Sequence, residues 1–254
     1  MKTHTLEQYL NKTLDVESFA AADASMNGLQ VDSGKNREIT RIGYTVDASL
    51  ETFEQAARLS CDAMIVHHGL FWGKSQRIIG THYRRIATLL SHDISLFAYH
   101  LPLDAHGRFG NNAVMAQLLG LQQVVPFGEY HGVNIGVMGV HPEGLTLGQV
   151  SDLLGFRPDT GLHILPFGKD RVNSIAIISG GAPSEVEQAV RLGADLYVTG
   201  ETSHTMYGFC KEEGINMISG GHYQSEVFGV SALAKHLSEK FSLTCTFIDV
   251  PTGL

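Results

Sequence analysis

Short apolar runs alternate along the chain with segments whose apolar residues recur at helical spacing. Residues 39–47 form a β-branched and aromatic run, and Phe53, Ala56 and Leu59 follow at helical spacing. This rhythm continues through the chain and predicts an α/β fold with mostly parallel strands. We expect strands at 39–47, 63–66, 95–101, 133–140, 172–179, 195–199 and 216–219, and helices at 51–60, 82–91, 111–119, 146–154, 185–192 and 223–240.

An internal repeat is the most informative feature of this pattern. Residues 42–68 align with residues 175–201 at an offset of 133, and seven of the 27 columns are identical. A second correspondence, at an offset of 122, pairs the His-x3-acid motif at 100–104 with the one at 222–226. Amphipathic helices can resemble one another without common origin. We favour two related α/β lobes, with ligands at the carboxyl ends of their strands. The identical columns are Ile42/Ile175, Glu54/Glu187, Gln55/Gln188, Ala56/Ala189, Arg58/Arg191, Leu59/Leu192 and Asp62/Asp195.

The turn-rich stretch at 126–132 is the expected boundary between the lobes. The first lobe would then cover residues 1–126 and the second residues 127–254, with no inserted third domain. The segment 102–104 after the fifth predicted element is expected to stay extended, because Pro102 disfavours helix continuation.

Composition narrows the class of protein. A chain that is 43% hydrophobic and 17% charged can bury a core, which excludes intrinsic disorder. No run of about 18 apolar residues predicts a membrane span, and the first residues lack the apolar region of a signal peptide. The net charge of −8 argues against nucleic-acid binding. Three cysteines are too few for a disulfide framework, which favours the cytoplasm. The 13 histidines require closer attention, because histidine is the commonest metal ligand.

Three clusters of histidine and acidic residues follow predicted strands. His67 and His68 close one strand and could ligate a metal or form a half-buried pair bonded to backbone. His222 and Glu226 lie four apart on one helical face, as metal ligands or as a surface pair. Asp104 could bridge or cap a metal, or form a simple turn. Five or six nitrogen and oxygen donors exceed one tetrahedral zinc site, so the set favours two divalent ions.

Further residues near these clusters could act on a substrate. His100 could ligate the metal or orient it from outside. Glu201 and His204 follow the strand that corresponds to the one ending in His67-His68, and could contact substrate or transfer protons. Alternatively, Glu201 begins a helix and His204 packs there. The ligand types suit Zn, Mn, Fe or Mg and leave the metal open.

The chain resembles the Nif-three-like dinuclear-metal family, whose members are often labelled homologues of type 2 GTP cyclohydrolase I. The resemblance runs in order over nearly the whole chain. It rests on the motifs at Met26-Asn27-Gly28-Leu29-Gln30-Val31, Val66-His67-His68-Gly69-Leu70-Phe71-Trp72, Tyr99-His100-Leu101-Pro102-Leu103-Asp104, Arg108-Phe109-Gly110-Asn111-Asn112, Val198-Thr199-Gly200-Glu201 and Gly220-Gly221-His222-Tyr223-Gln224-Ser225-Glu226.

This resemblance implies two related lobes around a central dimetal cleft, in a toroidal homohexamer built as a trimer of dimers. It places the metal ligands on His67, His68, Asp104, His222 and Glu226, with Glu226 as a bridging group and His100 beside them. Some members of the family carry an inserted domain that this chain is too short to hold.

Two functions remain open from the sequence. The first is a metal-dependent hydrolase in which His100, Glu201 or His204 moves protons. For GTP, the reaction would open the purine ring at C8 and release formate. Because no P-loop is present, metal, Arg108 and backbone would have to hold a nucleotide. The second is a non-catalytic, metal-dependent regulatory or adaptor protein.

Overall fold

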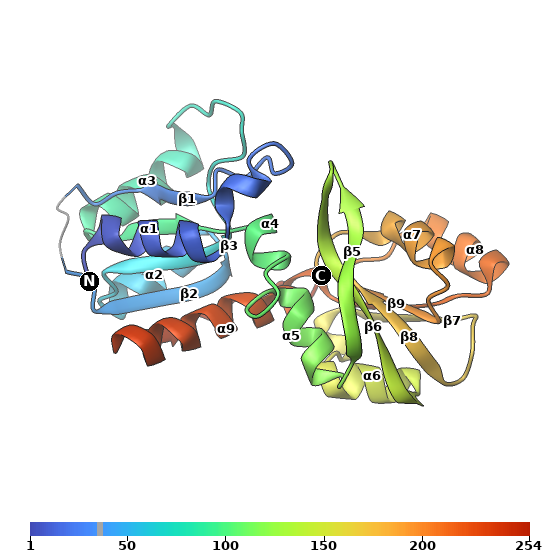
Figure 1. Cartoon of the computed structure of the whole chain (residues 1–254). Coiled ribbons are helices and arrows are strands. Elements are labelled where there is room, and N and C mark those ends of the chain that lie inside the picture. Colours follow the sequence, from blue (N-terminus) through green and yellow to red (C-terminus); the bar gives the residue numbers. More distant parts are fainter. Residues whose placement is uncertain (35–37) are drawn as a thin grey trace. The chain divides into compact units, whose positions relative to one another are not determined.

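The computed structural model describes residues 1–34 and 38–254, and its chain forms two compact units (Figure 1). Unit 1 comprises residues 1–103 and 230–250, and unit 2 comprises residues 104–229 and 251–254. The division therefore differs from the boundary that we expected at residue 126. That position lies inside strand β5 (Gln122–Tyr130), which pairs with its hairpin neighbour and cannot separate two units.

Unit 1 is built on a five-stranded sheet with the strand order β1-β4-β3-β2-β11. Strands β11, β2, β3 and β4 are mutually parallel, and β1 runs antiparallel to β4 at the edge of the sheet. The strands are β1 (Gly28–Val31), β2 (Arg41–Asp47), β3 (Ala63–His68), β4 (Ser95–Ala98) and β11 (Thr244–Phe247). The helices are α1 (Thr3–Thr13), α2 (Leu50–Arg58), α3 (Gly80–Ser91) and the larger part of α9 (His222–Phe241), with a 3-10 turn at Val16–Phe19.

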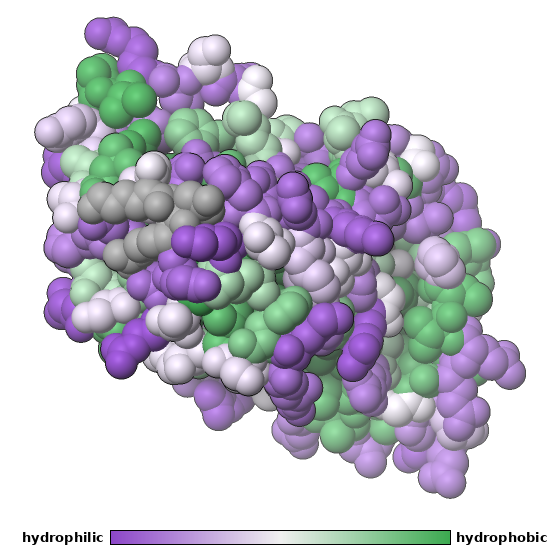
Figure 2. All heavy atoms as spheres, turned by 60° about the vertical axis from the view of Figure 1, so that its left-hand side comes forward, coloured by the Kyte–Doolittle hydropathy of each residue, from purple (hydrophilic) through white to green (hydrophobic). Residues whose placement is uncertain are grey.

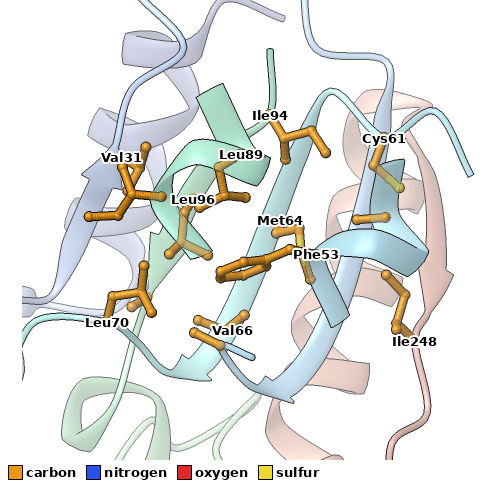
Figure 3. Packing of buried hydrophobic residues seen from close by; sticks show 14 residues of the cluster. Val31, Phe53, Cys61, Met64, Val66, Leu70, Leu89, Ile94, Leu96 and Ile248 are labelled. Atoms are coloured by element: carbon orange, nitrogen blue, oxygen red, sulfur yellow. The ribbon is translucent and has the colours of Figure 1, made fainter. Parts of the chain in front are cut away.

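The core of unit 1 packs helices α2 and α3 against the sheet (Figure 3). Phe53 of α2 and Leu89 of α3 are fully buried against Met64 and Leu96 of the central strands. Burying one such side chain contributes about 1.5–3 kcal/mol. Helix α2 begins at a capping box in which Ser49 and Thr52 exchange hydrogen bonds. The apolar residues that recur at helical spacing in the sequence therefore pack against the sheet, as predicted.

Unit 2 is built on a six-stranded sheet with the order β5-β6-β8-β9-β10-β7. Strands β8, β9 and β10 are mutually parallel, whereas β5, β6 and β7 pair antiparallel. The chain passes from unit 1 to unit 2 within the short helix α4 (Leu101–Asp104). The further elements of unit 2 are α5 (Asn111–Leu118), β5, β6 (Val133–Leu145), α6 (Leu147–Leu154), β7 (Leu162–Pro166), β8 (Val172–Ile177), α7 (Val186–Arg191), β9 (Leu196–Thr199), α8 (His204–Glu213), β10 (Asn216–Gly220) and the start of α9, with 3-10 turns at Pro158–Thr160 and Pro183–Glu185.

The internal repeat is present in the two sheets. In unit 1, Ile42 pairs with Ala63, and in unit 2, Ile175 pairs with Leu196, so the strand register follows the offset of 133. The repeated aspartates also have one role. Asp62 accepts hydrogen bonds from the backbone at the start of β2, and Asp195 does the same at the start of β8. The fold thus consists of two related α/β units.

The second correspondence needs an offset of 121 in the strands, because Ser95 pairs with Ala63 and Asn216 pairs with Leu196. The motif alignment needed an offset of 122 because the glycine-rich connection before α9, in unit 2, has one extra residue. Five of the nine strand pairs among the described residues are parallel, so most pairs are parallel as expected. One other expectation was wrong. Residues 101–104 form a short helix, because Pro102 occupies its first turn, where no backbone donor is needed.

Polar and apolar residues are interspersed over the face shown in Figure 2. The exposed large apolar side chains include Ile78, Ile79 and Tyr83, at the start of α3. Among the described residues, no helix is both long and apolar enough to cross a membrane.

Candidate metal centre

Unit 1 gathers three imidazoles at the carboxyl ends of its parallel strands. His67 and His68 are the last residues of β3, and His100 follows β4. One ring nitrogen from each of the three lies within 4.8 Å of the other two. The ring centroids of His67 and His68 are 4.7 Å apart, and those of His67 and His100 are 5.1 Å apart. The strand end therefore does turn both neighbouring histidines toward one point.

Each of these imidazoles has an acceptor at Nδ1. The Nδ1 atom of His67 is 2.9 Å from the carbonyl oxygen of Tyr99. The corresponding atom of His68 is 2.8 Å from a carboxylate oxygen of Asp47, and that of His100 is 2.9 Å from Asp23. Hydrogen bonds of this kind fix the tautomer that carries its proton on Nδ1. The nitrogen that each ring could offer to an ion is then Nε2.

Asp23 is a supporting residue that sequence reasoning missed. Its side chain is 1% exposed, and its two oxygens accept hydrogen bonds from Ser25 N, Asn27 Nδ2, His100 Nδ1 and Leu101 N. Burial raises the pKa of Asp23, but the hydrogen bonds from His100, Asn27 and Ser25 lower it by more, so the pKa lies below its ordinary value. No sequence signal singled it out, because it lies in an irregular loop far from His100 in the chain.

Asp47 is a second carboxylate that sequence reasoning missed, although its position in the sequence could have revealed it. Asp47 ends β2 and lies directly beside His68 in the parallel register of β2 and β3. Aligning the two predicted strands at their carboxyl ends would have placed the two residues together. The Met26–Val31 motif also has a structural role here. Asn27 accepts a hydrogen bond from the backbone N–H of His100, and Gln30 accepts one from Leu70 in the turn after His68.

Unit 2 gathers a second set of donors, of which some follow β9 and β10. His222 begins α9, and its Nε2 lies 3.3 Å from Glu226 one turn later. Its Nδ1 lies 2.5 Å from Glu201, which follows β9. Burial lowers the pKa of His222, but Glu226 and Glu201 together raise that pKa to about 9. Glu201 therefore orients His222 in the same way that Asp47 orients His68.

Asp104 belongs to this second set. It is 6% exposed, and one of its oxygens accepts hydrogen bonds from Asn111 and Ser179. Carboxylate oxygens of Asp104 and the 3% exposed Glu226 lie within 4.8 Å of each other. Two buried carboxylates so close would repel each other when both are ionised, and a bound cation would offset that repulsion.

Glycine allows the strand ends of unit 2 to approach this closely. A Cβ atom built on Gly200 would lie 2.6 Å from Ser225 Oγ, 2.7 Å from the carbonyl oxygen of Gly180 and 2.9 Å from His222 Cα. Real Cβ atoms do not make such contacts. The Gly200 that precedes Glu201 is therefore required by packing.

His204 has a different environment. It begins α8 and, with Tyr207, Thr202 and Ser203, lines a surface hollow of about 560 Å³ beside His163 of β7. The groups of potential metal donors found among the described residues do not include His204. Its expected part in substrate contact or proton transfer stays a prediction.

The donor types in both units fit divalent ions. Imidazoles with Nδ1 held by an acceptor, and buried carboxylates held by amide and hydroxyl donors, are the usual protein environment of such ions. All three cysteines are free, and none belongs to these donor groups, which excludes a thiolate zinc site among the described residues.

Comparison with known proteins agrees with this architecture. The model of the family described as Duf34/NIF3 (NGG1p interacting factor 3) matches residues 1–253. A "GTP cyclohydrolase 1 type 2 homolog" of Archaeoglobus fulgidus is 40% identical over 97% of both chains, and one of Salmonella typhimurium is 39% identical over 99% of both. The crystal structure of TTHA1606 from Thermus thermophilus is similar over the full length of both chains, with 42% identity and a TM-score of 0.88.

Proposed function

The chain belongs to the Duf34/NIF3 family, and we propose that it is a metal-dependent hydrolase. In this proposal two divalent ions bind through His67, His68, Asp104, His222 and Glu226. The relatives' name, homolog of GTP cyclohydrolase 1 type 2, suggests a nucleotide as substrate. Zn, Mn, Fe and Mg all remain compatible with the mixed donors.

The observation that carries the proposal is that the histidines at the strand ends each have a hydrogen-bond acceptor at Nδ1. The Nδ1 atoms of His68 and His222 each face a carboxylate, and that of His67 faces a backbone carbonyl. Structural ion sites are usually closed by four strong ligands, whereas hydrolytic sites combine imidazole and carboxylate with open positions. When bound, the ions would lower the pKa of water and stabilise negative charge on the substrate.

The chain's own residues supply orientation and proton transfer in this proposal. Glu201 holds His222 through Nδ1, and Asp23 holds His100 in the same way. His100 and Glu201 are therefore the candidates for moving a proton. His204, at its surface hollow, stays a further candidate for substrate contact or proton transfer. The exposed Arg108 is the candidate for holding a phosphate group.

The test is turnover by metal-loaded protein, with GTP and a panel of phosphoesters and amides as substrates. The control is the double variant His67→Ala, Glu226→Ala under the same metal loading. His92→Ala, at an exposed histidine of α3's end, serves as a matched control for substitution itself. We expect turnover by the wild type and by His92→Ala only. Equal rates for the wild type and the double variant on every substrate would refute the hydrolase.

The alternative is a non-catalytic, metal-dependent regulatory or adaptor protein. The family's description as an interacting factor favours keeping this alternative. A stoichiometric partner that binds only the metal-loaded chain, without any turnover, would support it. We also propose a homohexamer in the cytoplasm. Light scattering on the purified protein would measure the number of chains, and any mass other than six chains would contradict the hexamer.

A further inference from the structure

A surface hollow of unit 2 lies along one edge of its sheet. The hollow has a volume of about 560 Å³ and is lined by strand β7 and by the start of helix α8, which are neighbours in Figure 1. We propose that it binds an extended peptide segment with acidic side chains, which adds to β7 as a further strand. This site goes beyond the proposed hydrolase, shares only His204 with it, and requires neither metal nor turnover.

Strand β7 is an edge strand whose backbone can pair with a partner. Among the described residues, it pairs only with β10, in antiparallel register. The backbone N–H of Asn216 in β10 donates to the carbonyl oxygen of Asp195, on the side of β9. Because successive backbone groups of a strand alternate in direction, Met217 of β10 faces β7 and pairs there with Leu165. The preceding residue of β7, Ile164, therefore directs its N–H and C=O away from the sheet. An edge of this kind is a template for an added strand.

The stretch of β7 that can pair in this way is short and well defined. Pro166 ends β7 and has no N–H, and the N–H of Leu162 already donates to the carbonyl oxygen of Arg157. Among the described residues of β7, Ile164 is then the one whose N–H and C=O both face a partner. A docked segment should therefore form its central pair of backbone hydrogen bonds with Ile164.

An apolar wall stands beside this edge. The side chain of Leu165 lies on the same face of the sheet as that of its partner Met217, which contacts α8. Tyr207 of α8 is 52% exposed, and both Leu165 and Tyr207 line the hollow. The ring of Tyr207 packs edge-on against Phe167, with the centroids 5.1 Å apart. One side chain of an added strand would therefore meet an apolar surface that is already held in place.

The polar part of the hollow suits an anionic group. His163 and His204 line it together with Thr202 and Ser203. Each neutral imidazole carries one N–H donor, and each hydroxyl carries another donor. Ser203 is also the N-cap of α8, where the helix dipole is positive. None of the described residues that line the hollow is acidic, although the chain has a net charge of −8. This charge complementarity favours an acidic peptide over a basic one.

Substitution at Ile164 separates the backbone of β7 from its side chains. Proline is tolerated at an edge position whose N–H faces outward, because no hydrogen bond of the sheet is lost there. Ile164→Pro should therefore keep the fold and remove one docking hydrogen bond. Ile164→Val keeps the N–H and is the matched control.

The probe is a fluorescein-labelled peptide of about eight residues in which valine and glutamate alternate, which is long enough to span β7. Two control peptides carry lysine in place of glutamate, or methyl groups on the backbone nitrogens. Fluorescence anisotropy is measured with the full chain in the presence of a chelator. We expect saturable binding of the glutamate peptide by the wild type and by Ile164→Val. Binding should be weaker by at least about tenfold for both control peptides and for Ile164→Pro.

Tyr207→Ala tests the apolar wall. Its matched control is Tyr130→Ala, at an exposed tyrosine of β5 in the same unit. We expect binding of the glutamate peptide to weaken by about tenfold for Tyr207→Ala and to stay unchanged for Tyr130→Ala.

Four results would overturn the proposal. They are no saturable binding of the glutamate peptide by the folded wild type, equal binding of the methylated peptide, equal binding of the lysine peptide, and equal binding by folded Ile164→Pro and Ile164→Val. If circular dichroism shows that Ile164→Pro is unfolded, the comparison of Tyr207→Ala with Tyr130→Ala decides instead. Failure of the hydrolase is separate. Peptide binding without turnover leaves this site intact, whereas turnover by a wild type that binds no peptide refutes only this site.

Discussion

Replacing Asp23 by asparagine tests whether this buried carboxylate holds unit 1 together around His100. Asp23 accepts four hydrogen bonds, two at each oxygen, at 2.8–3.0 Å. An amide nitrogen cannot accept, so either orientation of the new side chain leaves two donors without their acceptor. A hydrogen bond to a charged group contributes about 1.5–3 kcal/mol, and for two such bonds we therefore expect a loss of about 3–6 kcal/mol.

Urea denaturation followed by Trp72 fluorescence measures this loss, because the only tryptophan lies in unit 1. The midpoint should fall while the dependence on urea stays unchanged. Asp32→Asn is the control, because this side chain is 35% exposed and, among the described residues, it forms an ion pair with His4 at 3.8 Å and accepts a hydrogen bond from Gly34 N, which an amide oxygen can still accept. A surface change of this kind should cost at most about 0.5 kcal/mol. Equal midpoints for the two variants would show that the hydrogen bonds of Asp23 do not stabilise unit 1.

Three further predictions follow from other parts of the structure. Burial raises the pKa of Asp195, but hydrogen bonds from Lys169, Asn173 and Ser174 lower it below 3.8. The stabilising contribution of Asp195 should therefore be complete above about pH 5 and lost as the pH falls through the lowered pKa. The free energy of unfolding, measured from pH 5 downward, should fall less steeply for Asp195→Asn than for the wild type. Identical pH dependence of the two proteins would contradict this prediction. Gly200→Ala should destabilise the protein by about 1–3 kcal/mol, whereas Gly208→Ala in helix α8 should stabilise it by about 0.5–1 kcal/mol, because outside the local helix backbone no described atom lies within 4 Å of the new Cβ. Thermal unfolding of both variants measures the two effects. Equal shifts of the melting temperature would refute the packing argument. Adding Zn²⁺ at a hundredfold excess over its dissociation constant to chelated protein should stabilise it by about 2.7 kcal/mol, and a melting temperature indifferent to zinc would contradict metal binding by the native state.

The sequence predicted the repeated architecture because strand and helix periodicity are local properties. The alignment of Ile42 with Ile175 and of Asp62 with Asp195 is matched by equal strand register and equal hydrogen bonding in the two units. Sequence reasoning missed α1, α8, β1, β5, β7 and β11, of which β1 and β11 are only four residues long. The strand β5 was interpreted as a boundary because its exposed, glycine- and proline-containing pattern is typical of turns.

The candidate donors could be found from sequence because imidazoles and carboxylates that follow strands are visible as residue types. The hydrogen bonds that orient them could not. The Nδ1 acceptor of His100 lies 77 residues away at Asp23, and Asp104 is held by Ser179, 75 residues along the chain. Such pairs have no fixed spacing, since loops of different length can bring the same two groups together.

The amino-acid sequence by itself therefore determined the two α/β halves and the kinds of ligand available at their strand ends. Only the tertiary structure decided which acceptor each Nδ1 atom faces and which carboxylates hold the imidazoles. It also placed His204 at a separate hollow of unit 2, lined with β7. The physical reason is that periodicity follows from the local backbone, whereas hydrogen-bond partners depend on how distant segments pack.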